Sequence, residues 1–162
     1  MSAIPPPALR TELRTRPQAD LQHIPELARR FDVSKEAMAR AYADYHPETI
    51  AIVVCKDARI LRVYKNPLRF PFVQPSYGQP VPRGSSYHRV EHATGVTSGP
   101  DSCIPDLWIN VERGQRAPAL FEQVYPQRDG YALILLKLEK PDEEEEEEER
   151  ALERSWRVGF GR

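Results

Sequence analysis

The spacing of apolar residues changes at Thr49, and this change constrains the fold more than any other feature of the sequence. Before it, apolar side chains recur every three or four residues, as they do along one face of an α-helix. After it, the chain carries short β-branched and apolar runs, beginning with Ile50–Cys55, which are typical of strands. A helical segment followed by strands predicts the α+β class.

Residues 7–46 are expected to form short helices that share a core. Asp20 is a candidate N-cap for the second helix, because a short acidic side chain can accept a hydrogen bond from the first turn. Pro25 lacks a backbone donor, so the start of this helix could instead lie at Ile24. The 16 prolines of the chain favour short elements throughout.

The third helix is expected to begin after Ser34, a favourable N-cap, and to end before Pro47. Two helices joined by a short turn, with Val33 packed between them, have the outline of a helix-turn-helix. In a DNA-binding protein the second of these helices offers exposed polar groups to base edges. The available groups are Lys35, Glu36 and Arg40.

The charge balance disfavours DNA binding by this helical segment. Residues 1–46 hold 7 basic and 6 acidic side chains, whereas binding to phosphates needs clustered positive charge. We therefore interpret the segment as a packing module. A small DNA-binding regulator remains an alternative.

A hairpin is expected from Ile50–Cys55 and Ile60–Tyr64, with Asp57 in the turn between them. Residues 66–105 are rich in Pro, Gly and Ser, which predicts irregular chain with at most edge strands. Further strands are expected at residues 107–111 and 130–138.

Three regions follow from these patterns. Residues 1–46 form a helical, helix-turn-helix-like module, and residues 47–140 form an α+β domain with a mainly antiparallel sheet. Residues 141–162 form an acidic tail, in which Glu143–Glu149 repel one another and favour partial disorder.

Cysteine usage and hydropathy place the chain in the cytoplasm. Cys55 and Cys103 lie far apart and outside any Cys-x-x-Cys pair, so we expect two free thiols. The apolar runs are too short to span a bilayer, and Met1–Pro7 has no basic start followed by a sustained apolar stretch. We expect no membrane partner.

Three stretches in this order resemble a known family. The first is residues 4–46, where a Pro-rich start leads to LARRFDVSKEAMAR. The second is Thr49–Pro82, which contains the IVVCKDAR hairpin followed by NPLRFPF. The third runs from Phe121 to Leu136, FEQVYPQRDGYALILL, and continues through the acidic run to Leu152–Trp156. Together they resemble the C-terminal, non-catalytic portion of ImmA/IrrE-type zinc metallo-endopeptidases.

The resemblance implies a GAF-like sheet domain and a regulatory or recognition role. In that family the peptidase cleaves a helix-turn-helix repressor in stress or mobile-element responses, so the implied partner is such a repressor or a separate peptidase chain. The family's zinc site depends on His-Glu-x-x-His, a motif that this sequence lacks. We therefore expect no catalysis and no cofactor on this chain, and zinc only where the peptidase region is present.

The absence of that motif has three explanations, which the sequence leaves open: a truncated gene, a misassigned start, or a separately encoded catalytic partner. If the start is misassigned, the reading frame upstream of Met1 encodes His-Glu-x-x-His. An in-frame stop codon directly before Met1 would exclude this explanation.

A second zinc motif gives a different alternative. His88, Glu91 and His92 fit the inverted pattern His-x-x-Glu-His, in which two histidines one helical turn apart hold zinc beside a glutamate base. Such a site would make the chain a stand-alone zinc hydrolase. The local sequence has room for only about two helical turns, and the third ligand would have to be Glu112 or Glu122.

Overall fold

The computed structural model of the chain describes residues 4–112, 114, 117–139 and 150–155. Most of the segment predicted to be partly disordered, namely residues 141–149 and 156–162, lies outside these ranges. Residues 150–155 are helical. Within the described ranges, no helix has the length and apolar character needed to cross a membrane.

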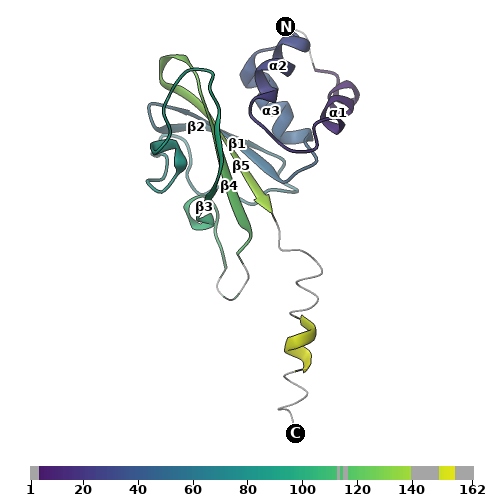
Figure 1. The fold of residues 1–162 in the computed structure, drawn as a ribbon, viewed down its shortest axis with the longest axis vertical. Coiled ribbons are helices and arrows are strands. Elements are labelled where there is room, and N and C mark those ends of the chain that lie inside the picture. Colours follow the sequence, from purple (N-terminus) through teal and green to yellow (C-terminus); the bar gives the residue numbers. More distant parts are fainter. Residues whose placement is uncertain (1–3, 113, 115–116, 140–149, 156–162) are drawn as a thin grey trace.

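In the described part of the chain, five antiparallel strands form one sheet (Figure 1). The strands are β1 (Ile50–Lys56), β2 (Arg59–Lys65), β3 (Ser98–Cys103), β4 (Ala119–Pro126) and β5 (Tyr131–Glu139). Their order is β2-β1-β5-β4-β3, so β5 lies at the centre and pairs with both β1 and β4. The predicted α+β class and antiparallel sheet are confirmed.

The helices that precede the sheet gather on one of its faces (Figure 1). They are α1 (Pro6–Arg14), α2 (His23–Arg30) and α3 (Lys35–Tyr45). Their apolar stripes meet alternate residues of the central strands, so helices and sheet share one hydrophobic core. Leu13, Leu27 and Tyr42 are fully buried in it, together with Ile52 of β1.

The segment between β2 and β4 covers the other face of the sheet. It contains two short 3-10 helices, η1 (Ser86–His88) and η2 (Pro105–Leu107), and the edge strand β3. Phe70 and Trp108 of this segment pack against alternate residues of β1 and β5, such as Val53 and Ile134. The sheet is therefore buried on both faces, which accounts for the nearly continuous apolar sequences of β1 and β5.

Two local signals of the sequence are confirmed. The Ser34 hydroxyl accepts a hydrogen bond from the Ala37 N–H at 3.0 Å and caps α3, which ends at Tyr45. In the β1–β2 hairpin, Asp57 and Ala58 have φ of 48° and 63°, as in the type I′ turn that matches the twist of paired strands.

The prediction that Asp20 caps the second helix is wrong. The helix α2 begins at His23, one residue before the later of the two expected starts. The Asp20 carboxylate instead accepts a hydrogen bond from the Gln22 N–H at 2.9 Å, within the turn that leads into the helix. Short polar side chains stabilise such turns as well as caps, which explains the error.

The strand predicted at residues 107–111 does not form. Trp108 is buried against the sheet, and Ile109 makes only an isolated bridge with Val73. Conversely, β4 was not predicted, because Glu122 and Gln123 interrupt its apolar run. Both side chains are buried, and their partners come from other parts of the fold.

Candidate functional site

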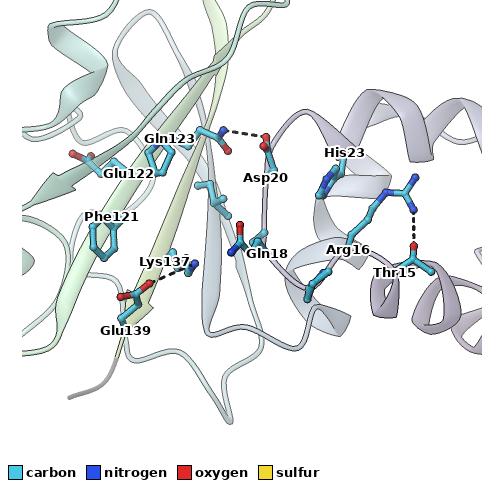
Figure 2. Close-up of a pocket in the computed structure, with 14 residues that line it drawn as sticks. Thr15, Arg16, Gln18, Asp20, His23, Phe121, Glu122, Gln123, Lys137 and Glu139 are labelled. Atoms are coloured by element: carbon cyan, nitrogen blue, oxygen red, sulfur yellow. Dashed lines mark hydrogen bonds and ion pairs between the residues drawn. The ribbon is translucent and has the colours of Figure 1, made fainter. Parts of the chain in front are cut away.

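A cavity of about 440 Å³ lies where the helical layer meets β4 and β5 (Figure 2). The connection between α1 and α2 forms one wall, and β4 and β5 form the other. The apolar lining residues are Pro17, Ala19, Pro100, Phe121 and Leu135, and the polar ones include Arg16, Gln18, Asp20, His23, Gln123 and Lys137. A molecule held here would touch both layers of the protein.

Gln123 of β4 joins the two walls of this cavity. Its side-chain oxygen accepts a hydrogen bond from the Leu21 N–H at 2.7 Å, and its amide nitrogen donates to the Asp20 carboxylate at 3.0 Å. Figure 2 shows the second of these bonds crossing from the strand to the α1–α2 connection. The buried amide therefore fixes this connection against the sheet.

Tyr42 of α3 holds the same connection from the helical side. Its hydroxyl oxygen accepts from the Asp20 N–H at 3.0 Å and lies 3.0 Å from Nδ1 of His23. The direction of this hydrogen bond follows the tautomer of the His23 imidazole, because the hydroxyl can either donate to Nδ1 or accept from it. Burial raises the pKa of Tyr42 and lowers the pKa of His23, so both are uncharged at neutral pH.

His46 also stabilises the α1–α2 connection. Its Nε2–H donates to the Arg16 carbonyl oxygen at 3.0 Å, and its Nδ1 accepts from the Glu48 N–H at 3.0 Å. This ring is 1% exposed, and burial lowers its pKa. Both nitrogens are used for structure, so His46 is not available for proton transfer.

Two cations flank the cavity, and each is paired. Arg16 contacts Glu12 at 3.0 Å and Glu26 at 2.5 Å. Lys137 contacts Glu48 at 2.8 Å and Glu139 at 3.6 Å. The pairs hold both cations in place, and they leave the cavity close to neutral.

The side chains that line this cavity are suited to binding a small molecule. The one hydroxyl among the lining residues, all of which the structure describes, belongs to Thr15, which donates to the Glu12 carbonyl oxygen at 2.6 Å. Phe121 offers a half-buried ring, and His23 offers an uncharged imidazole. These groups fit a small molecule that has a flat apolar part and a hydrogen-bond acceptor.

The inverted zinc motif lies elsewhere, in the segment that covers the other face of the sheet. His88 ends the short helix η1 and places Nε2 at 3.0 Å from the Val81 carbonyl oxygen. Nε2 of His92 lies 2.8 Å from the Tyr87 carbonyl oxygen, and Glu91 is exposed. Residues 88–92 do not form the α-helix that would align the two imidazoles.

Among the residues that the structure describes, no group of three or more His, Cys, Asp or Glu side chains is placed to hold a metal ion. Of the two candidate third ligands, Glu112 is exposed and Glu122 is buried. The Glu122 carboxylate accepts hydrogen bonds from the Ser85 hydroxyl at 2.5 Å, the Ser86 N–H at 3.0 Å and the Trp108 indole at 2.9 Å. It anchors the covering segment to β4.

The residues considered for DNA contact are mostly engaged with the sheet. The Glu36 carboxylate pairs with Arg62 and accepts a hydrogen bond from the Tyr64 hydroxyl at 2.9 Å. Lys35 lies 5.9 Å from the centre of the Tyr125 ring, and Arg40 is exposed. Lys35 and Glu36 also line a surface pocket of about 500 Å³ together with Arg62.

The two cysteines are free thiols, as expected. Cys55 is buried in β1, and burial raises its pKa to about 12. Burial also raises the pKa of the Cys103 thiol to about 12, with a further contribution from Glu122. Thiols that stay protonated at neutral pH are poor nucleophiles.

Comparison with known proteins finds no family model that matches the chain and no curated protein whose sequence matches it.

Proposed function

We propose that this chain is the non-catalytic regulatory and recognition portion of an ImmA/IrrE-type zinc metallo-endopeptidase. In this role it assists the regulated cleavage of a helix-turn-helix repressor. The observation that carries the proposal is the cavity between the helical layer and the sheet, because a ligand there contacts both layers at once. A ligand that favours one arrangement of the layers over another shifts the population between them.

The arrangement of elements supports a helix-turn-helix-like module followed by a GAF-like domain. The turn between α2 and α3 is closed by a hydrogen bond from the Val33 N–H to the Ala28 carbonyl oxygen at 3.0 Å, in keeping with a helix-turn-helix-like module. An antiparallel sheet with helices on one face and a long covering segment on the other is in keeping with a GAF-like domain. The resemblance implied both, in this order along the chain.

The hydrogen bonds around the cavity suggest how a signal would pass. A ligand acceptor that competes with Asp20 for the amide of Gln123 would loosen the α1–α2 connection. That connection is bonded through Asp20 to Tyr42 of α3, so its displacement would move the helical layer. The repressor or a separate peptidase chain would then meet a changed surface.

The test is a reconstituted cleavage assay. It combines the chain, fused or as a separate polypeptide, with an ImmA/IrrE peptidase encoded in the same genome and its repressor substrate. We expect the chain to change the cleavage rate, and Phe121→Trp, which fills the cavity, to reduce this effect. Phe72→Trp is the matched control, because Phe72 is 75% exposed and lies outside the cavity. An identical rate with and without the chain would refute the proposal.

A further inference from the structure

A second groove, of about 410 Å³, lies where α1, the end of α3 and the segment after β2 meet. Arg10, Arg14 and Arg69 line this arginine groove, and Asp44 is the one carboxylate among its lining residues, all of which the structure describes. All four side chains belong to exposed residues. The lining therefore has a surplus of two positive charges, which favours anions.

The three guanidinium groups are positioned without being neutralised. Arg69 donates to the carbonyl oxygens of His46 at 2.8 Å and Pro47 at 3.2 Å, and Arg10 lies 5.1 Å from the centre of the Tyr45 ring. Within the part of the chain that the structure describes, Arg14 makes no hydrogen bond or ion pair.

Arginines on the neighbouring side of the helical layer behave differently. Arg16 and Arg30 both contact the Glu12 carboxylate, at 3.0 Å and 2.8 Å. The Glu12 carboxylate therefore pairs with these two arginines, whereas among the described residues no carboxylate forms an ion pair with Arg10, Arg14 or Arg69. In the arginine groove, three guanidinium groups without an ion pair line one space that an external anion can enter.

The arginine groove borders the point where the last strand ends. The Leu138 N–H bonds to the Thr49 carbonyl oxygen at 3.0 Å, and Pro47, two residues before Thr49, lines the groove. Beyond Glu139, the sequence continues into Asp142 and Glu143–Glu149, eight consecutive acidic residues. Three or four extended residues span about 10–13 Å, so this run begins within reach of the groove.

We propose that the arginine groove binds the chain's own acidic run, residues 142–149. Each contact between an exposed guanidinium and a carboxylate is weak alone and is screened by salt. The short covalent connection from β5 raises the effective concentration of the run to the millimolar range, which allows several weak contacts to act together. Binding also separates carboxylates that otherwise repel one another. The proposal does not depend on the peptidase-associated role.

A competition experiment on the full chain tests whether residues 142–149 bind in the arginine groove. The probe is a fluorescein-labelled peptide with the sequence of residues 140–150, and its affinity is measured by fluorescence anisotropy at low salt. In a variant with each of Glu143–Glu149 replaced by Gln, the groove is vacant. We expect this variant to bind the probe about tenfold more tightly than the natural chain does, which corresponds to about 1.4 kcal/mol.

Reversing the charge of Arg14 tests whether the labelled peptide binds in the arginine groove. In the Gln-substituted background, we expect Arg14→Glu and the milder Arg14→Gln to weaken probe binding. Arg29→Glu is the matched control, because Arg29 is an exposed arginine of α2 outside the arginine groove, and it should leave binding intact. Equal probe affinity for the natural and Gln-substituted chains would overturn the proposal. So would an equal loss from Arg14→Glu and Arg29→Glu.

Discussion

Replacing Glu122 tests whether a buried carboxylate holds the covering segment on the sheet. The side chain is 1% exposed and accepts three hydrogen bonds, from Ser85, Ser86 and Trp108. Glu122→Leu removes the acceptor while keeping a side chain of similar size. The Ser85 hydroxyl can rotate to another acceptor, but the Ser86 N–H and the Trp108 indole N–H are fixed.

The expected cost follows from these two fixed donors. A buried donor that loses its acceptor costs about 1–3 kcal/mol, and removal of the buried charge offsets part of this loss. We expect Glu122→Leu to lower the free energy of unfolding by about 3 kcal/mol, or the melting temperature by about 6–12 °C for a chain of this size. Glu122→Gln keeps one acceptor oxygen and should cost less.

Urea unfolding followed by Trp108 fluorescence provides the assay, in a Trp156→Phe background so that one tryptophan reports. Trp108 is fully buried, so its emission shifts to the red when the covering segment opens. Glu91→Leu is the control, because Glu91 is exposed and its replacement should change stability by less than about 0.5 kcal/mol. If Glu122→Leu costs no more than Glu91→Leu, the carboxylate is not an anchor and the reasoning fails.

Three further predictions concern the helices and histidines. Because burial lowers the pKa of His23 and His46, the unfolded chain binds more protons below pH ~6.5. Stability measured by denaturant titration should therefore fall on acidification from pH ~7 to ~5.5, by up to about 1.4 kcal/mol per pH unit for each histidine, and a flat profile would contradict this. Ser34→Ala should cost about 1 kcal/mol in thermal unfolding and Ser34→Gly only a few tenths, whereas equal losses would argue against a capping role. Metal analysis after dialysis should find no stoichiometric zinc, since His88 and His92 each direct Nε2 to a backbone carbonyl. One equivalent of zinc that disappears in His88→Ala would support the inverted motif instead.

Local sequence predicted the elements whose stabilising contacts are themselves local. Ser34 caps α3 through a residue three positions away, and the turn at Asp57 depends on the φ angles of two adjacent residues. The strongest predicted strand, residues 130–138, corresponds to β5, whose burial on both faces keeps its sequence almost entirely apolar. All the residues that make each of these patterns lie within about ten positions of one another in the sequence.

The candidate site could not be predicted in this way. Gln123 is buried because its partners, the Leu21 N–H and Asp20, lie about a hundred residues earlier in the chain. Glu122 is buried because Ser85 and Trp108 approach it from the covering segment. In the sequence, two adjacent polar residues indicate a break in a strand, and only the tertiary fold supplies the donors and acceptors that make their burial favourable.

The order of the strands has a consequence for synthesis on the ribosome. The first strand, β1, pairs with β5 along its whole length, from Ile50 opposite Lys137 to Lys56 opposite Tyr131. The ribosome therefore releases the central strand last among the five, and until then β1 and β4 each present an unpaired edge, that of β1 strongly apolar. The β1–β2 hairpin and the helices can begin to assemble early, because their contacts are close in sequence. The sheet is completed only when β5 pairs with both β1 and β4. A chain stalled before Tyr131 would leave these two strand edges exposed to aggregation.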